Sequence, residues 1–473
     1  MTIQNPSRPS ADILLAGIIG CIGAVIWGFQ LHGTLVSSPV YCDSGYYLAI
    51  AQQLAEGHSL YSEIRCAYPP LWLYLMAGLL KILPPTGYTG WLVVQALVNL
   101  ATASLIGLLC HAFTSKRWAA ALAGWLFACS TFQFGGDQVL LEIPSLAFGL
   151  LSAYLIQRSN GKWHRILLAG VCAAVSFGIK QYGAGFILLN LALLMANDPK
   201  NWRQPLIYSA GVLVPLLAVF AINPLVVSIV QSGYGTSDIA RQIYRDLGPL
   251  RHIPEACRQL FRYFLPGLLA LLYPGFYLRG KKQALPLAWC LLGIIGFLGQ
   301  FYFNNGDHYY LYLLGIGAVA IGCLTAYCIR EPWYIGLTVL LLTAYTCRCQ
   351  YDRYHNWWWY RDGDRARERE LTGVVKRITP EESTLYVFNA ENIGQYYLCQ
   401  RRPPVIDGCL SYSFGPLALN NDLVAQRIRQ TDYLLKRKDL EWEFKVCDSI
   451  RILLSRCDTL YADDKNVLLK ADF

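Results

Sequence analysis

The chain has 473 residues, of which 55% are hydrophobic and only 15% are charged. Much of the hydrophobicity lies in runs long enough to cross a bilayer core of about 30 Å, so the composition excludes an ordinary soluble domain and predicts a polytopic membrane protein. The formal net charge of +9 does not require a nucleic-acid partner, because basic residues collect in the short loops between membrane spans.

The first apolar run, residues 13–36, is followed by no small-residue cleavage site and is predicted to be an uncleaved membrane anchor. The segment after it predicts a short amphipathic helix in the membrane interface, with one apolar and one polar face. The apolar face would hold Tyr46, Tyr47, Ile50, Ala51 and Leu54, and the polar face Gln52, Gln53 and Glu56. Asp43 or Ser44 would cap the start of this helix, and Gly57 would end it.

Asp43 is the candidate catalytic residue of this segment. A carboxylate next to an apolar span is costly, so its presence indicates a function. At the positive end of the helix dipole the Asp43 carboxylate is expected to stay ionised, and it could then accept a proton or bind a metal ion. The alternative is that Asp43 only caps the helix, which is a common use of aspartate.

Residues 68–83 form a second apolar run, opened by Pro69-Pro70 as in the first turn of a helix. At 1.5 Å per residue this run reaches only about 22 Å, which is too short to span a membrane. It is therefore predicted to be a second interfacial helix. Counting it as a span would place Lys116 and Arg117 outside and set Asp43 and Glu142 on opposite faces, against the positive-inside rule.

The remaining apolar runs bring the prediction to about eleven crossings. They are residues 89–112, 118–134, 143–157, 165–180, 183–196, 205–230, 263–278, 284–303, 309–329 and 333–347. Basic residues gather in the connections assigned to the cytoplasm, which places the N-terminus inside. An odd number of crossings then places the C-terminal segment outside the cytoplasm.

On the outer side this topology gathers further candidates with Asp43, namely Asp137, Glu142, Lys180 and His308. The long outer loop 231–262 also carries arginines, among them Arg258 and Arg262, which indicates an anionic ligand. A solvated loop is the alternative for these arginines. For Lys180 the alternative is a lysine that snorkels to the interface, and for His308 it is an interfacial hydrogen-bonding residue.

The composition becomes mixed polar near residue 350, which divides the chain into a transmembrane part, residues 1–350, and an extracytoplasmic part, residues 351–473. The second part is predicted to be a small α/β domain with helices at 361–377 and 391–399 and strands at 384–388, 403–406 and 432–435. A hairpin around residues 463–466 would end it. Cysteines in both outer regions, among them Cys399 and Cys457, leave disulfides open.

Several short motifs follow one another in a fixed order along the chain. The first is Tyr41-Cys42-Asp43-Ser44-Gly45-Tyr46-Tyr47, followed by Tyr68-Pro69-Pro70-Leu71. The later ones are Glu142-Ile143-Pro144, Gly178-Ile179-Lys180-Gln181-Tyr182 and His308-Tyr309-Tyr310-Leu311. Together they resemble the first outer loop, the second acidic residue, the basic turn and the late His-Tyr motif of the GT-C membrane glycosyltransferases, in particular the group of protein O-mannosyltransferases and the lipid A aminoarabinose transferase. Each motif alone is weak, but the ordered set is fairly specific.

The resemblance implies an inverting transfer of a sugar from a polyprenyl-phosphate donor to a protein, lipid or glycan acceptor, at the outer face of the plasma (inner) membrane. Asp43 would be the base, and Glu142 or Asp137 would assist it or hold a divalent cation such as Mg²⁺ or Mn²⁺. Lys180 and His308, with Arg258 or Arg262, would hold the lipid phosphate. Tyr46 and Tyr68 would contact substrate. Ala67-Tyr68 departs from the group, which often has a charged residue before the first-loop proline.

A transporter or flippase for a lipid-linked glycan is the competing class, because it too would gather charge in a lipid-accessible cavity. Such proteins place ionisable groups near the bilayer midplane and often contain inverted repeats. Here the charges gather at one interface and the sequence contains no recognisable repeat, so the enzyme is the favoured interpretation. A non-catalytic relative with a sensing C-terminal segment is a third hypothesis.

Overall fold

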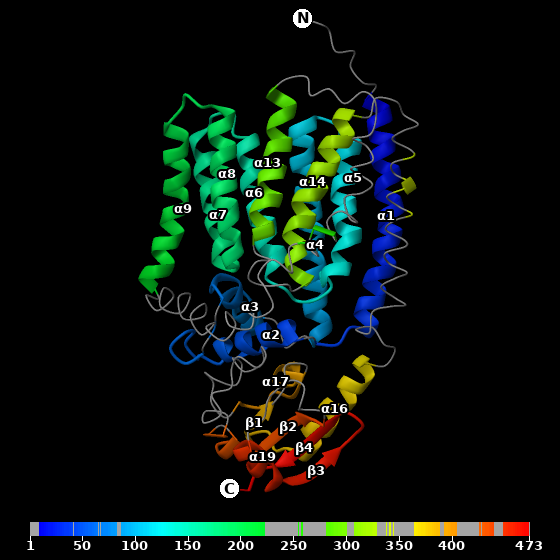
Figure 1. The fold of residues 1–473 in the computed structure, drawn as a ribbon, viewed down its shortest axis with the longest axis vertical. Helices are drawn as coiled ribbons and strands as arrows, with labels where there is room; N and C mark the ends of the chain where they lie inside the picture. The colour runs from blue at the N-terminus through cyan, green and yellow to red at the C-terminus, as the bar shows by residue number, and fades with distance from the viewer. Residues whose placement is uncertain are drawn as a thin grey trace, which may run out of the picture. The chain divides into compact units, whose positions relative to one another are not determined.

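The computed structural model describes a large part of the chain, and the statements below refer to that part. The described residues are 9–40, 42–64, 66, 68–82, 87–222, 254, 257–258, 281–299, 307–328, 337, 340–341, 344, 364–387, 392–403, 425–426, 428–438 and 448–472. They form two compact units (Figure 1). The first comprises residues 1–34, 93–222 and 247–358, and the second comprises residues 35–92, 223–246 and 359–473.

The first unit is helical, and several of its helices are apolar and long. Its described helices are α1 (Pro9–Ser37), α4 (Tyr88–Thr114), α5 (Arg117–Ser130), α6 (Glu142–Gln157), α7 (Trp163–Ile179), α8 (Ala184–Asn197), α9 (Arg203–Ile222), α13 (Lys281–Leu298) and α14 (Tyr310–Cys328). The ends of α1 and α4 extend into the second unit. A short 3-10 turn at Thr131–Phe134 follows α5, a second at Gln181–Gly183 follows α7, and a third at Asp307–Tyr309 precedes α14.

Four stretches within the described helices are long and apolar enough to cross a membrane, as a multi-pass membrane protein requires. They are Ile13–Val36, Tyr88–Thr114, Arg203–Ala221 and Tyr310–Tyr327. Helices also occur at the other predicted spans that the structure describes, and those at Trp163–Ile179, Gln181–Asn197 and Ala284–Leu298 are shorter apolar helices. The predicted span 263–278 and most of 333–347 lie outside the described residues, so the count of eleven stays a prediction.

Helices of the first unit pack closely where small residues face one another. A Cβ atom added to Gly170 of α7 would lie 2.1 Å from the carbonyl oxygen of Tyr208, and one added to Gly211 of α9 would lie 2.2 Å from that of Leu167. In lipid such small residues let two helix backbones approach and gain van der Waals contact. The packing therefore fixes α7, the helix that leads into Lys180.

The second unit begins with two short helices, α2 (Cys42–Ala55) and α3 (Leu71–Ile82), which pack on each other. Gly57 adopts a left-handed φ of 103°, and His58 N–H bonds to the Gln53 carbonyl, so α2 ends in the glycine stop that the sequence predicts. The amphipathic prediction for α2 holds only in part: Glu56 is exposed and Gln52 is half-buried, but residues 44–51 are buried continuously and Gln53 is only 5% exposed. The cause is a second covering element from the far end of the chain.

That covering element is α17 (Gly394–Cys399), which packs on α2. A Cβ atom added to Gly45 would lie 2.6 Å from the Gly394 nitrogen, so the two backbones meet where neither has a side chain. Trp91 Nε1 donates a hydrogen bond to the Tyr397 hydroxyl at 3.1 Å. The domain boundary predicted from the sequence at residue 350 did not anticipate this packing. Residues 35–92 and the C-terminal segment belong to one compact unit.

The C-terminal segment is a small α/β fold, as predicted (Figure 1). Its elements are α16 (Asp364–Ile378), β1 (Leu385–Val387), α17, β2 (Tyr433–Arg437), α19 (Asp448–Ser455), β3 (Asp458–Ala462) and β4 (Asn466–Lys470). The sheet order is β1-β2-β4-β3, with β1 and β2 parallel and the other pairs antiparallel. The sequence did not predict α19, and most of the strand predicted at 403–406 lies outside the described residues.

Candidate functional site

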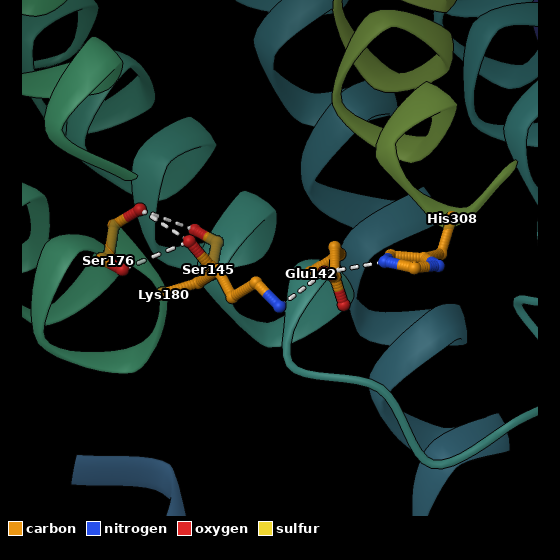
Figure 2. Close-up of polar contacts among 5 residues, drawn as sticks. All are labelled: Glu142, Ser145, Ser176, Lys180 and His308. Carbon is orange, nitrogen blue, oxygen red and sulfur yellow. Dashed lines mark hydrogen bonds and ion pairs between the residues drawn. The ribbon is translucent and has the colours of Figure 1, made fainter. Parts of the chain in front are cut away.

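The first unit contains a buried ionic cluster built from three of the predicted site residues (Figure 2). Lys180 Nζ lies 2.8 Å from Glu142 Oε1, and neither side chain is exposed to solvent. His308 Nε2 lies 3.7 Å from the same oxygen, and its side chain is 22% exposed. The carboxylate is therefore shared between a fully buried ammonium and an imidazole that solvent can reach.

The local backbone explains how Glu142 and Lys180 meet. Glu142 is the first residue of α6, where unpaired backbone N–H groups favour a carboxylate. Helix α7 ends at Ile179, and Lys180 takes an extended conformation with φ −145° and ψ 134°. A Cβ atom at Gly183 would lie 2.4 Å from the Ser176 backbone, so the turn that carries Lys180 folds directly against the end of α7.

Two buried serines tie α6 to α7 beside the ion pair (Figure 2). Ser145 Oγ donates to the Ser176 carbonyl at 2.9 Å, and Ser176 Oγ donates to the Ser145 carbonyl at 2.7 Å. Ser145 lies one helical turn after Glu142, and Ser176 lies one turn before Lys180. The reciprocal hydrogen bonds therefore hold the ends of both helices in register around the cluster.

Aromatic rings form a second side of the cluster. The Lys180 ammonium lies 5.7 Å from the centre of the Tyr309 ring, within the usual range of a cation–π contact. The rings of His308 and Tyr309 are 4.2 Å apart, and Tyr182 meets Tyr309 edge-on at 5.1 Å. The His-Tyr motif therefore supplies both a titratable group and an aromatic face to the buried lysine.

Helix α4 fixes the segment that leads into Glu142. Asn99 Nδ2 donates to the Gly136 carbonyl at 2.6 Å, and Leu140 N donates to Gln95 Oε1 at 3.4 Å. Both carboxamides are buried, and Asp137 in the same segment is only 3% exposed. Buried polar groups on an apolar helix are costly without such bonds, so Gln95 and Asn99 act as supports for this segment.

Asp43, Tyr46 and Tyr68 belong to the second compact unit, together with Tyr47. Asp43 is partly buried in the first turn of α2, and Tyr46 and Tyr47 follow one turn later on the same helix. The ring of Tyr68 meets that of Tyr46 edge-on at 6.0 Å and that of Tyr47 at 5.4 Å. The first-loop motif thus folds into an aromatic cluster near the carboxylate-bearing end of α2.

No family model and no curated protein matches the chain. Among solved structures, apo ArnT from Cupriavidus metallidurans superposes with a TM-score of 0.65 at 11% identity, covering 98% of this chain and 99% of that one. The same enzyme bound to undecaprenyl phosphate gives 0.62 at 12% identity with the same coverage. Both are lipid A aminoarabinose transferase structures in the GT-C superfamily.

A second GT-C neighbour is the archaeal oligosaccharyltransferase AglB from Archaeoglobus fulgidus, in complex with an inhibitory peptide and a dolichol-phosphate. It gives a TM-score of 0.55 at 12% identity and covers 91% of this chain and 70% of that one. The chain has the GT-C fold. The resemblance that the sequence motifs indicated is therefore confirmed at the level of the fold.

The burial of Lys180 excludes the alternative that this lysine snorkels to the membrane interface, because its side chain is 0% exposed. Arg258 is exposed, and Arg262 lies outside the described residues. The sequence interpretation overlooked Ser145, Ser176, Gln95 and Asn99. Their spacing along the sequence was the available signal. The two serines lie one helical turn from Glu142 and from Lys180, and the two carboxamides lie one turn apart on an apolar span.

The described residues contain no group of three or more His, Cys, Asp or Glu side chains placed to hold a divalent cation. At Glu142 the Lys180 ammonium already lies 2.8 Å from the carboxylate, and it would repel a cation bound to the same oxygen. The arrangement therefore does not fit a metal at Glu142. Cys399 and Cys457, two of the cysteines for which disulfides were left open, are free thiols.

Proposed function

We propose that the protein is a membrane glycosyltransferase that moves a sugar from a polyprenyl-phosphate donor to an acceptor at the outer face of the plasma (inner) membrane. The N-terminus would be cytoplasmic and the C-terminal segment extracytoplasmic, as the loop charges predict. The observation that carries the proposal is the buried Glu142–Lys180–His308 cluster within a GT-C fold. A neighbour with this fold was solved with undecaprenyl phosphate bound.

The cluster has the properties expected of a site that stabilises a phosphate leaving group. As the glycosidic bond breaks, negative charge grows on the phosphate oxygen, and fixed cations facing that oxygen lower the barrier. His308, which is partly exposed, would contact the phosphate. Lys180, which is fully buried, would stabilise the phosphate electrostatically, because its surroundings have a low dielectric constant. Arg258, which is exposed, and Arg262 would add cations from the long loop.

Glu142 would have a positioning role and one direct role. Its Oε1 atom contacts both Lys180 and His308, which fixes the two side chains in place. Its Oε2 atom is buried and has no hydrogen-bond donor among the described residues. A buried carboxylate oxygen with spare acceptor capacity could receive a hydrogen bond from a substrate hydroxyl, which would offset the cost of leaving it unpaired.

Asp43 would be the general base that takes the proton from the acceptor hydroxyl. The acceptor oxygen would attack the anomeric carbon while the phosphate leaves, so one displacement would invert that carbon. A phosphate leaving group needs no proton donor, so a single carboxylate can suffice. Tyr46 and Tyr68, which pack edge-on in the same cluster as Tyr47, would shape the acceptor side of the site.

The test measures sugar transfer by the purified chain from a synthetic polyprenyl-phosphate sugar, with Asp43→Asn as the decisive variant. Asp43 lies in the first turn of α2 rather than at its N-cap, and asparagine keeps the size of the side chain there, so the fold should persist. If Asp43 is the base, turnover should fall by roughly 10²- to 10⁴-fold. The exposed Asp464→Asn is the matched control and should keep normal turnover. Near-normal transfer by Asp43→Asn would reject the assignment.

The same assay tests the phosphate site through His308→Ala. Loss of a hydrogen bond to a charged group costs about 1.5–3 kcal/mol, or roughly ten- to a hundredfold in donor affinity. The KM for the lipid donor should rise while the acceptor KM stays unchanged. An unchanged donor KM would contradict the phosphate assignment. Movement of the lipid-linked sugar across vesicles without any transfer would favour the flippase interpretation instead.

A further inference from the structure

A polar cavity of about 320 Å³ lies within the second unit, between the C-terminal half of α2 and two turns of the C-terminal segment. Its lining comprises Ala49, Gln52, Gln53 and Glu56 from α2 and its end, Glu381 and Glu382 after α16, and Tyr396, Gln400, Arg401, Arg402 and Pro403 from α17 onward. None of these residues has a role in the transfer reaction proposed above. The volume is at the lower end of the roughly 300–1,000 Å³ typical of small-molecule sites.

The walls of this cavity are fixed by packing and hydrogen bonds. The close approach of Gly45 and Gly394 locks α17 against α2. Arg401 is buried, and its guanidinium donates to the carbonyls of Cys399, Lys376 and Thr379, at 3.0, 3.3 and 2.8 Å, and to the Thr379 hydroxyl. These bonds hold the segment after α17 onto the end of α16. The cavity is therefore preformed, which lowers the entropic cost of binding a ligand.

One buried polar group in the lining has an unmet hydrogen-bonding requirement. Gln53 is 5% exposed, and its Oε1 atom has no hydrogen-bond partner among the described residues. A buried unpaired amide oxygen costs about 1–3 kcal/mol, so natural structures rarely keep one without a ligand or water. Gln400, also in the lining, holds a left-handed φ of 55°, a strained conformation that occurs often at binding sites.

The charges of the lining indicate what kind of ligand would satisfy it. Three carboxylates line the cavity, and one of them, Glu382, pairs with Arg402 at 3.6 Å. The other lining arginine, Arg401, donates its hydrogen bonds to neutral oxygens of Cys399, Lys376 and Thr379, so it has few donors left for a ligand but keeps its charge. Three carboxylates against two guanidinium groups therefore leave the lining with one excess negative charge and with several carboxylate acceptors. Such a lining attracts hydroxyl and amine groups and repels phosphates.

We propose that this cavity binds a single sugar unit that carries hydroxyl or amine groups and no phosphate. Gln53 Oε1 would accept a hydrogen bond from the sugar, and the Glu56 carboxylate would accept from a vicinal hydroxyl or an amine. The charged lining does not suit a lipid chain, and the volume is too small for a folded peptide. The inference does not depend on transferase activity, because the ligand is held by residues outside the proposed reaction.

The test uses the purified full chain in lipid nanodiscs and saturation-transfer NMR titrations with glucose, glucosamine and glucose 6-phosphate. We expect glucose and glucosamine to bind, glucosamine more tightly, and glucose 6-phosphate to bind at least tenfold more weakly than glucose. Gln53→Leu should lower the affinity for both sugars about three- to tenfold, as the loss of one neutral hydrogen bond predicts. Absence of sugar binding to the wild-type chain, or equal binding of the phosphorylated sugar, would overturn the proposal.

Glu56→Gln provides a second variant that does not disturb the interior, because Glu56 is exposed. It should remove the preference for glucosamine over glucose and leave thermal unfolding unchanged. Glu370→Gln, an exposed substitution on α16 away from the lining, is the matched control and should bind as wild type. If Gln53→Leu and Glu56→Gln both bind the two sugars normally, the sugars bind elsewhere and the assignment of this cavity fails.

Discussion

The buried ion pair between Lys180 and Glu142 makes a sharp prediction about stability. Both side chains are fully buried and their charged atoms lie 2.8 Å apart. In Lys180→Met the carboxylate keeps only His308, at 3.7 Å, and breaking a buried pair in this way costs about 3–5 kcal/mol. Because His308 still offers a partial partner, we expect a loss near the lower limit, about 3 kcal/mol. Glu142→Gln should cost a similar amount, since it leaves a buried ammonium.

The double variant Lys180→Met/Glu142→Gln distinguishes a specific pair from general damage to the core. It removes both charges, so its stability should return close to that of the wild type. With losses of about 3 kcal/mol in each single variant and nearly none in the double variant, the coupling energy of the cycle should be about 6 kcal/mol, above the range of most measured pairs. The assay is reversible denaturation of the purified chain in mixed micelles, followed by tryptophan fluorescence.

The exposed pair Arg402–Glu382, 3.6 Å apart with side chains 69% and 83% exposed, is the control cycle. Solvent screens such a pair, so its coupling should not exceed about 1 kcal/mol. Additive losses in the Lys180/Glu142 cycle would refute the argument that the two charges stabilise one another. The result also matters for kinetics, because a loss of activity in Lys180→Ala alone would mix a folding defect with a loss of phosphate binding.

Two further predictions concern topology and cysteine chemistry. A cysteine introduced at the exposed Ser62 should react with a membrane-impermeant maleimide in intact cells, whereas one at the exposed Ser115 should not; the reverse pattern would invert the proposed orientation. Burial raises the pKa of the Cys399 thiol to about 12, so the thiolate is scarce below that pH. Alkylation of Cys399 in the folded chain should therefore be slow at pH 8 and rise about tenfold per pH unit, and fast labelling at pH 8 would contradict its burial.

Local features of the fold were readable from the sequence. Gly57 ends α2 as predicted, since a left-handed residue at a helix terminus is a property of a few neighbouring residues. The short α3 and the strands on either side of the turn at 463–466 also formed where propensity and turn residues placed them. The apolar runs gave the helices of the first unit to within a few residues, because length and hydropathy alone decide whether a helix suits a bilayer.

The site was only partly readable. Ordered motifs named Glu142, Lys180 and His308, but they did not show that one carboxylate oxygen contacts both basic side chains. That contact depends on how α6, α7 and the segment before α14 pack, and on the Ser145–Ser176 hydrogen bonds that set the register. Sequence spacing indicates which residues share a helix face, whereas a contact between helices depends on packing that no single segment encodes.

The clearest departure from the sequence prediction was the burial of α2. Its pattern of apolar and polar residues is compatible with a helix at an interface, and the pattern carries no information about what covers the polar face. The covering helix α17 comes from the C-terminal segment and meets α2 through Gly45 and Gly394. Gln53 is 5% exposed and lines the polar cavity together with Tyr396 of α17. A helix is encoded by its own residues, but its burial is decided by distant segments, because burial is a property of the packed chain.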